Sequence, residues 1–452
     1  MNAITNPDNV VVVGNGQAGI QLVDSLRKEG YTGAITLIGE ETHHPYQRPP
    51  LSKDYLAAGK DPVPLPLRPE KFFTTHDVDA RLGVRVTSID RTARTATLDD
   101  GTTLAYSNLV LATGAANREL AVPGADLAGI HGLRTLTDAQ ALHARLDTVR
   151  SVVVIGAGFI GLEFAAAARA RGLDVTVLEY ADRPMGRALT PVMSGFFADA
   201  HQRLGVTLRL GEGIASFDGN NGHVTAAVST TGNRYPADLV LVGVGVTPRT
   251  ELAAAAGLNV DNGIVVDGNL RTSDPDIYAL GDCASFPNIH AGTRTRLESV
   301  QNATDQARHA AVAILAGRPG SEPGASTGAG AGAESGSIPG SEPAGGTGTG
   351  TGLGGYADLP WFWSNQGPLR LQIAGLVAPG DQTVLRGNPA EEKFSVFCFR
   401  NGSLTAVESV NQPADHMAAR RLLTAGLPLT PDQAADPDFD LKTYSKQQPA
   451  TV

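Results

Sequence analysis

The stretch SVVVIGAGFIGLEFAAAARARGLDVTVLE, from Ser151 to Glu179, has the residue order of a dinucleotide-binding unit. It opens with a short apolar run, 152–155, that is bounded at once by glycine, as a buried parallel strand should be. An alanine-rich helix follows, and a second apolar strand at 175–178 ends at Glu179. A carboxylate at this spacing accepts hydrogen bonds from an adenosine ribose. The stretch therefore predicts a nucleotide site on a parallel sheet.

The turn between strand and helix holds three glycines in GxGxxG spacing: Gly156, Gly158 and Gly161. The first permits a tight turn, the second lets the backbone approach a pyrophosphate, and the third lets the helix pack closely on the strand. The helix N-terminus then faces the phosphates. The alternative for such a motif is a tight structural turn without a ligand.

The N-terminal region repeats this order. A strand at 10–13, a glycine turn and a helix with one apolar face lead to a second strand at 35–38 that ends at Glu40. The glycines of this copy are Gly14, Gly16 and Gly19. Two units imply two nucleotides, and flavin with nicotinamide is the usual pair when a hydride passes between cofactors. The alternative is one functional site and one decayed copy.

Composition limits what can surround these units. The chain has 452 residues, 42% hydrophobic and 18% charged, which fits two or three domains with real cores. Its net charge of −10 argues against a general nucleic-acid binder, which needs a basic surface. Cys283 and Cys398 are the only cysteines, too few for a disulfide framework or a cysteine-rich metal site. Because no apolar run has membrane length and no signal opens the chain, we expect a cytoplasmic protein without a metal centre.

Two further segments differ in composition. Residues 320–355 are rich in Gly, Ser and Pro, cannot offset the entropy of ordering, and are predicted to be a disordered, flexible insertion. Residues 356–452 alternate apolar and polar positions in PWFWSNQGPLRLQIAGL and EEKFSVFCFRNGSLTAVESV, and then read DHMAARRLLTAG. This pattern indicates antiparallel strands followed by a helix.

Several separated motifs carry a resemblance that covers nearly the whole chain. Besides the two glycine motifs they are RPPLSK at 48–53, LVLATG at 109–114, LRTLTDA at 133–139, LVGVGVTP at 241–248, YALGDCA at 278–284, ESVQNA at 298–303 and PWFWS at 360–364. Together they resemble the FAD-dependent, NADH-using bacterial ferredoxin reductases that serve haem monooxygenases and ring-hydroxylating dioxygenases. That family has a short connection where this chain has residues 320–355.

The resemblance implies an α/β fold with two Rossmann-like dinucleotide-binding domains, as in glutathione-reductase-like flavoproteins, plus a C-terminal α+β interface domain. The FAD-binding domain would comprise residues 8–116 and 250–319, the NAD-binding domain residues 117–249, and the interface domain residues 356–452. LVLATG and LVGVGVTP would be the two crossings between the nucleotide domains.

The same resemblance implies site residues. For FAD they are Gly14, Gly16, Ala18, Gly19, Glu40, Arg48, Lys53, Val86, Ala112, Thr113, Gly114, Arg134, Gly281, Asp282, Val300 and Trp363. For NAD they are Gly156, Gly158, Ile160, Gly161, Glu163, Glu179, Arg187 and Gly245. Lys53 and Glu163 resemble the family's ion pair beside the flavin and are the expected catalytic residues, since an ammonium near N5 stabilises the anionic reduced flavin. Without the resemblance, Glu163 is an ordinary charge in the first turn of a helix, and Asp282 has a capping role as its alternative.

The expected partner is an acidic [2Fe-2S] ferredoxin and, through it, a haem monooxygenase or dioxygenase. A helix at 298–311 should present its N-terminus to the flavin. A basic surface for the ferredoxin is expected from Arg294, Arg296, Arg420 and Arg421, although most arginines are merely solvated. One of Trp361 and Trp363 is expected near the flavin edge and the approach of the ferredoxin; the alternative is that they are core aromatics. No contact with nucleic acid or membrane is expected, and the chain should be a monomer or weak homodimer.

The expected function is electron transfer from NADH through FAD to ferredoxin. Glu179 should favour NADH, because its charge repels the extra phosphate of NADPH, while Arg183 and Arg187 leave room for the opposite preference. No cysteine precedes Cys283, which argues against the thiol chemistry of disulfide reductases with this architecture. Two alternatives stay open: an NADH oxidase or quinone reductase, and an NAD-sensing flavoprotein of the apoptosis-inducing type.

Overall fold

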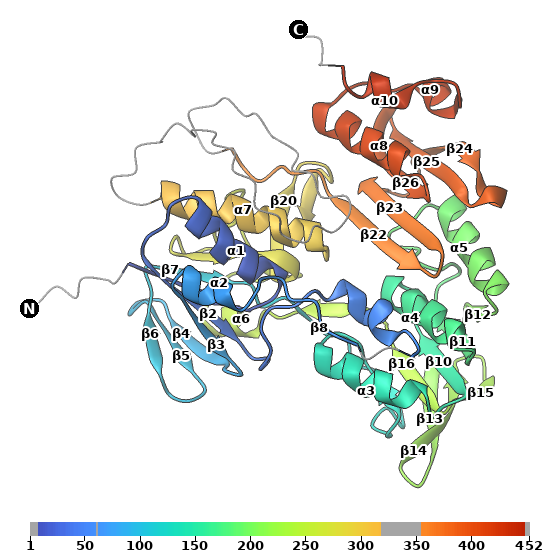
Figure 1. Cartoon of the computed structure of the whole chain (residues 1–452), viewed down its shortest axis with the longest axis horizontal. Coiled ribbons are helices and arrows are strands. Elements are labelled where there is room, and N and C mark those ends of the chain that lie inside the picture. The colour runs from blue at the N-terminus through green and yellow to red at the C-terminus, as the bar shows by residue number, and fades with distance from the viewer. Residues whose placement is uncertain (1–7, 60–61, 318–353, 448–452) are drawn as a thin grey trace, which may run out of the picture.

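The computed structural model describes residues 8–59, 62–317 and 354–447. Within these ranges the chain forms two parallel five-stranded sheets and one antiparallel five-stranded sheet, each covered by helices (Figure 1). The predicted α/β fold with a separate C-terminal α+β part is therefore confirmed. The predicted disordered insertion, 320–355, lies outside the described residues except for its last two.

The first parallel sheet is centred on β1, whose valines 10–13 are all buried. Burial on both faces explains why this strand is a continuous β-branched run rather than an alternating one. In sheet order the strands are Ile277–Ala279 (β19), Asn108–Leu111 (β7), Asn9–Val13 (β1), Ala34–Gly39 (β2) and Val78–Leu82 (β3). Helices α1 (Gln17–Lys28) and α7 (Val300–Ala316) lie side by side against the sheet (Figure 1).

The second parallel sheet repeats this arrangement around β10, as the opening sequence motif predicts. In sheet order its strands are Thr207–Leu210 (β12), Asp174–Glu179 (β11), Ser151–Ile155 (β10), Leu239–Val242 (β16) and Ile130–His131 (β9). Its helices are α3 (Leu136–Leu146), α4 (Phe159–Ala170) and α5 (Pro191–Arg203). Helix α4 follows the glycine turn directly, with Gly158 as its N-cap.

Smaller elements connect and flank the two sheets. Strands β8 (Ala115–Asn117) and β17 (Val246–Pro248) pair antiparallel, so the two chain crossings from LVLATG and LVGVGVTP run side by side (Figure 1). Three small sheets are formed by Val86–Asp90, Thr95–Leu98 and Thr103–Ala105 (β4–β6), by Ile214–Asn220, His223–Ser229 and Arg234–Pro236 (β13–β15), and by Ile264–Val265, Ala284–Asn288 and Thr293–Thr295 (β18, β20, β21). The short α-helices are Lys71–Thr75 (α2) and Glu251–Ala255 (α6). The 3-10 helices are Pro49–Ser52 (η1), Asp54–Leu56 (η2), Gly281–Cys283 (η3) and Pro389–Glu391 (η4).

The C-terminal sheet packs on two partners, because its side chains alternate between two faces. In β25 the residues Phe394, Val396 and Cys398 join the core of the second parallel sheet, whereas Phe397 and Phe399 join the core under the C-terminal helices. In sheet order the strands are Trp361–Gln366 (β22), Leu369–Gly375 (β23), Ser403–Val410 (β26), Lys393–Arg400 (β25) and Gln382–Asn388 (β24). The helices are Pro413–Ala425 (α8), Pro431–Ala435 (α9) and Leu441–Tyr444 (α10).

The structure differs from the sequence predictions in the ends of one helix, in one missed strand and in the packing of one segment. The helix predicted at 298–311 is α7, which begins at Val300 because the Ser299 side chain caps it by accepting from the Asn302 amide, and which continues to Ala316 because no breaker precedes Gly317. Strand β24 was missed because it is a largely exposed edge strand without apolar alternation. The segment 46–56, assigned by sequence to the first domain, places its large apolar side chains in the core of the second sheet.

Two further properties concern the described ranges alone. Among their helices, none combines the length and the apolar character needed to cross a bilayer. Among their side chains, no group of three or more His, Cys, Asp or Glu is placed to hold a metal ion.

Candidate active site

A cavity of about 1260 Å³ lies where the two parallel sheets and β22 meet. Its walls include Val13, Ala112 and Leu280, at or just beyond the carboxyl ends of β1, β7 and β19, and Val242 at the end of β16. Ligands of open α/β sheets bind outside these carboxyl ends. The volume exceeds the roughly 300–1,000 Å³ of an ordinary small-ligand pocket, so the cavity can hold a dinucleotide and part of a second ligand.

The predicted site residues converge on this cavity with few exceptions. All the residues predicted for FAD line it except Gly19. Of the residues predicted for NAD, the cavity is lined by Gly158, Ile160, Glu163, Arg187 and Gly245, and not by Gly156, Gly161 or Glu179. The glycines that do not line it are packed against backbone carbonyl oxygens, and Glu179 lies at the end of β11.

The glycine turns have the geometry that a pyrophosphate requires. Gly14 has a φ of +116°, and a Cβ there would lie 2.1 Å from the Ala112 carbonyl oxygen. A Cβ on Gly19 would lie 1.9 Å from the Gly14 oxygen, so helix and turn touch. By contrast, a Cβ on Gly16 would meet nothing within 4 Å. The backbone at this middle glycine therefore faces open space beside the start of α1, where an anion fits.

The second turn has the same geometry. Gly156 has a φ of +101°, a Cβ on Gly161 would lie 2.2 Å from the Gly156 oxygen, and a Cβ on Gly158 would meet nothing within 4 Å. Both turns thus fit a dinucleotide phosphate. This agreement argues against a decayed second copy.

The cavity is basic although the chain is acidic. Among the described residues it is lined by eight arginine and lysine side chains and six carboxylates, whereas the whole chain carries −10. An excess of cations in a partly closed site attracts an anionic ligand. The charge of the lining therefore fits a cofactor that carries a diphosphate.

Lys53 and Glu163 form an ion pair in the wall of the cavity, with Nζ 2.7 Å from Oε2 and only 14% and 5% of the two side chains exposed. Lys53 follows the short helix η1, which Pro49 and Pro50 make rigid. Glu163 lies in the first turns of α4. The carboxylate also accepts from Ser52 Oγ at 2.5 Å and from Ser364 Oγ at 2.6 Å.

Other charged residues of the cavity are paired as well. Arg134 bonds Asp282 at 2.7 Å, and Arg48 bonds Glu41 at 2.6 Å while donating to the Arg134 carbonyl oxygen at 2.7 Å. The helix η3 has no side-chain cap, so the capping role considered for Asp282 is wrong. Among the described residues, these pairs link the segment after β2 to the start of α3 and to η3.

Glu40 is neutralised by residues that the sequence analysis missed. Its carboxylate lies 2.5 Å from Arg249 and 3.2 Å from Arg85, and all three side chains line the cavity. Arg249 directly follows the LVGVGVTP motif, which is a signal that could have identified it. Arg85 and Glu41 carry no comparable signal beyond their position beside Val86 and Glu40.

The start of α7 and the tryptophans of β22 close another part of the cavity. Val300, the first residue of α7, and Trp363 both line it, so the positive end of the helix dipole points at the ligand space. The rings of Trp361 and Trp363 are 5.4 Å apart, and the Arg420 guanidinium lies 4.5 Å from the centre of the Trp361 ring. Trp363 is therefore a cavity residue as well as part of an aromatic cluster.

Part of the expected basic docking surface is wrong. Arg296 has only 10% of its side chain exposed, pairs with Glu298 at 2.7 Å and lines the cavity. Arg294 donates from Nη1 to the carbonyl oxygens of Val266 and Ser285 but is exposed. The prediction is therefore wrong for Arg296, and Arg294 stays a predicted surface residue.

Both cysteines are buried, as predicted, and neither lines the cavity. Burial raises the pKa of the Cys283 and Cys398 thiols, which keeps them protonated and poorly nucleophilic. This environment fits packing rather than thiol chemistry.

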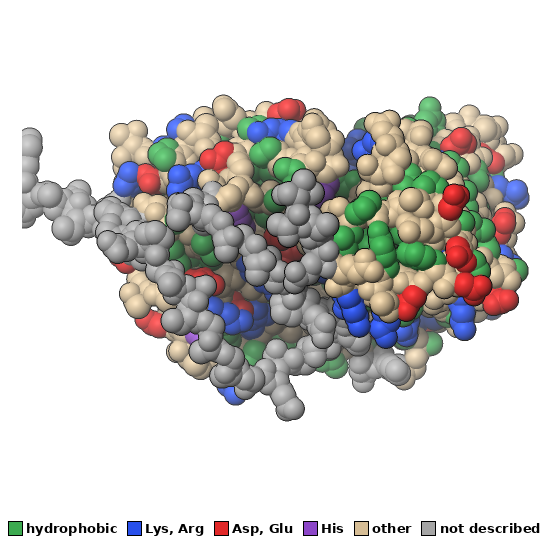
Figure 2. Space-filling model, turned by 90° about the horizontal axis from the view of Figure 1, so that it is seen from above, with side chains coloured by type: hydrophobic (Ala, Val, Ile, Leu, Met, Phe, Trp, Pro, Cys, Tyr) green, Lys and Arg blue, Asp and Glu red, His purple; other side chains and the backbone are tan. Residues whose placement is uncertain are grey.

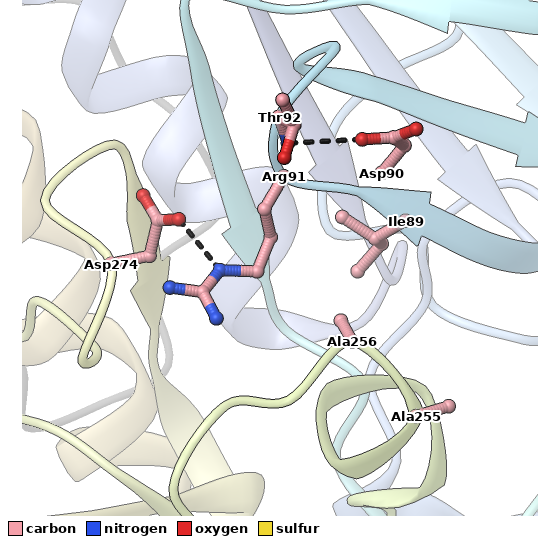
Figure 3. Close-up of a pocket in the computed structure, with 7 residues that line it drawn as sticks. All are labelled: Ile89, Asp90, Arg91, Thr92, Ala255, Ala256 and Asp274. Carbon is pink, nitrogen blue, oxygen red and sulfur yellow. Dashed lines mark hydrogen bonds and ion pairs between the residues drawn. The ribbon is translucent and has the colours of Figure 1, made fainter.

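A separate hollow of about 550 Å³ lies between β4 and α6 (Figure 3). In it Arg91 reaches across to Asp274, with Nε 2.7 Å from the carboxylate, and Asp90 caps its own turn by accepting from the Thr92 amide (Figure 3). Its charged groups are paired within the protein, and its lining includes no glycine of the two turns. The large cavity is therefore the candidate active site.

Two glycine cradles that open on one basic cavity, with a lysine–glutamate pair in its wall, define an FAD-dependent oxidoreductase with two dinucleotide sites. The family described as pyridine nucleotide-disulphide oxidoreductase matches residues 8–307, and the domain described as reductase C-terminal matches residues 361–445. The chain belongs to this family. The predicted family, the enzyme class and the cofactors FAD and NADH are confirmed at this level.

Similar proteins include ferredoxin reductases of oxygenase systems. Rhodocoxin reductase of Rhodococcus erythropolis is 48% identical over 434 residues, which are 96% of this chain and 93% of that protein. The ferredoxin reductase for the CYP199A2 system from Rhodopseudomonas palustris is 46% identical, with a TM-score of 0.87 over 97% of this chain and 100% of that one. The reductase in a covalent putidaredoxin reductase–putidaredoxin complex is 36% identical, with a TM-score of 0.84 over 97% of this chain and 98% of that one.

Proposed function

We propose that the protein moves electrons from NADH through FAD to a [2Fe-2S] ferredoxin that feeds a haem monooxygenase or a ring-hydroxylating dioxygenase. The observation that carries the proposal is the single cavity shared by the Gly16 cradle, the edge of the second unit at Gly158 and the Lys53–Glu163 pair. Such a cavity suits an encounter between flavin and nicotinamide. The similarity to ferredoxin reductases supports the choice of acceptor.

Each part of the cavity has a role in this proposal. FAD supplies the chemistry, since it accepts a hydride and can release electrons one at a time. The cradles at Gly16 and Gly158 bind the two diphosphates, and Glu40 and Glu179 accept from the two riboses. Lys53 stabilises negative charge on the reduced cofactor, and the start of α7 adds the helix dipole. Glu163 holds the Lys53 ammonium in place.

The proposal assigns residues 8–116 and 250–319 to FAD, 117–249 to NADH and 356–452 to the interface with the ferredoxin. The two parallel sheets and the antiparallel sheet support this division. We also propose a cytoplasmic location, which two buried, unpaired cysteines support. A monomer or weak homodimer belongs to the same proposal.

The proposed ferredoxin surface lies beside the C-terminal sheet. Figure 2 shows Lys and Arg side chains along the lower rim of the right-hand part of the molecule, and Asp and Glu side chains toward its outer end. Arg420 stacks on Trp361, which is two residues from cavity-lining Trp363, and Arg421 is exposed. A basic edge next to the cavity favours approach of an acidic protein.

The test is to follow NADH oxidation with a [2Fe-2S] ferredoxin as acceptor, and in parallel with oxygen or a quinone alone. We expect rapid reduction of the ferredoxin, slowed by added salt because the attraction is electrostatic, and slow turnover without it. Arg421→Glu should lower the ferredoxin rate and leave reduction of the flavin by NADH unchanged. Equally fast oxidation of NADH without any ferredoxin would mean that the protein is an oxidase or quinone reductase.

A further inference from the structure

The Glu163 carboxylate is held by donors from two separate parts of the chain. Oε2 accepts from Lys53 Nζ and from Ser52 Oγ, which come from η1 and its C-cap, and Oε1 accepts from Ser364 Oγ on β22. Ser364 is fully buried and belongs to the C-terminal sheet. The strand that carries cavity-lining Trp363 thus also supplies the donor to the second oxygen of Glu163.

The donors continue behind Ser364. Gln366 Nε2 lies 3.1 Å from Ser364 Oγ, and Gln366 Oε1 lies 2.7 Å from His201 Nε2 on α5. Gln366 and His201 are both fully buried. The row therefore runs from α5 through β22 to the carboxylate on α4 without an exposed member.

All the hydrogen bonds of this row point the same way. Because Ser364 donates its hydroxyl proton to Glu163, its oxygen is free to accept from the Gln366 amide nitrogen. The amide oxygen then accepts from His201, which must carry its proton on Nε2. Burial lowers the pKa of His201 and keeps it neutral, and its Nδ1 has no hydrogen-bond partner among the described residues. Aligned donors polarise one another and strengthen the last bond, the one to the carboxylate.

We propose that Ser364, supported by Gln366 and His201, is a positioning residue that stabilises the charge of Glu163 and so holds Lys53 at the flavin. The C-terminal domain would then shape the site of hydride transfer as well as the surface for the ferredoxin. This inference rests on the proposed placement of FAD beside Lys53. In the described part of the chain, Lys53 is the only ion-pair partner of Glu163, and the other groups that face it, Ser52 and Ser364, are neutral.

The test is Ser364→Ala, with Ser395→Ala as its matched control. Ser395 is a fully buried serine of the same sheet that also donates to a carboxylate, that of Asp415, at 2.9 Å, but it does not line the cavity. The measurement is the midpoint potential of the bound FAD at one fixed pH. Without the Ser364 donor the Glu163 carboxylate is held less firmly and orients the Lys53 ammonium less well, so the anionic reduced flavin loses stabilisation and the potential should become more negative.

The outcomes separate this inference from the proposed function. An unchanged potential in Ser395→Ala, with a more negative potential in Ser364→Ala, supports the positioning role, since a merely structural loss would change the stability of both variants and not the potential. A Ser364→Ala potential equal to that of the wild type overturns it. Glu163→Gln should shift the potential in the same direction. If the potential of Glu163→Gln equals that of the wild type, Glu163 does not act on the flavin, and the proposed function of the Lys53–Glu163 pair is wrong.

Discussion

Glu179 ends β11 with both carboxylate oxygens engaged by backbone amides. Oε2 accepts from Ala157 at 2.6 Å and Oε1 accepts from Ala181 at 2.8 Å. The side chain is thereby fixed beside the second glycine turn. Each oxygen has a further lone pair, so the carboxylate can still accept from ribose hydroxyls.

At this residue we predict that Glu179→Ala relaxes the choice between NADH and NADPH. Loss of the bonds to the ribose and of the charge that repels a 2′-phosphate should lower the ratio of kcat/KM for NADH to that for NADPH by about 10- to 100-fold. Asp182→Ala is the control, because Asp182 is an exposed acid in the same loop. An unchanged ratio in the Glu179 variant would contradict the assignment.

In the first glycine turn and helix α1, one glycine is needed for packing and another for ligand space. The third glycine, Gly19, lies against the Gly14 carbonyl, whereas the second, Gly16, faces open space. A methyl group on Gly19 must displace the backbone, whereas a methyl group on Gly16 only occupies the ligand space. The two substitutions are chemically identical and differ only in place.

For this element we predict opposite effects from two alanine substitutions. Gly19→Ala should cost about 1–3 kcal/mol of unfolding free energy because the chain is overpacked. Gly16→Ala should leave the melting temperature of the apoprotein nearly unchanged but lower FAD content, measured by the ratio of flavin to protein absorbance. Gly158→Ala, in the other turn, should keep its FAD and raise the KM for NADH. Full FAD occupancy in Gly16→Ala would argue against this turn as the FAD cradle.

On the scale of the whole molecule, a buried carboxylate joins the C-terminal sheet to the second unit. Glu408 of β26 accepts from the amide and the hydroxyl of Thr190, the N-cap of α5, at 2.8 and 2.5 Å. Its side chain is fully buried, and burial raises its pKa to about 7. The contact therefore holds a proton in the folded state that the unfolded chain, with its ordinary carboxyl pKa near 4.5, has already released.

The sign of the resulting pH dependence follows from this difference. Between pH 4.5 and 7 the folded state binds more protons at Glu408, so stability falls as pH rises through that window. The loss is on the order of 3 kcal/mol when pH reaches 7. Glu408→Gln should therefore gain stability relative to the wild type as pH rises from 5 to 7.5, as measured by thermal unfolding. Exposed Glu391→Gln is the control, and parallel curves for wild type and Glu408→Gln would refute this role.

The sequence by itself determined the two nucleotide units, because all their signals are local. A strand, a glycine turn, a helix and a second strand fit within about thirty residues, and the third glycine of each turn, Gly19 or Gly161, is required by its contact with the first glycine of the same turn. The C-terminal strands other than β24 were also predictable from sequence, since the alternation along β25 reflects its two packed faces. Lys53 and Glu163 entered only through the family resemblance, because neither has a local signature.

Only the tertiary structure decided what surrounds that pair. Lys53 lies 110 positions from Glu163 in the sequence, and Ser364 lies 201 positions from it. They meet because segment 46–56 and the C-terminal sheet both bury apolar side chains in the core of the second unit. Hydrophobic burial is not directional and is not specified by spacing along the chain. Which buried polar groups it brings together at Glu163 is therefore a property of the packed domains.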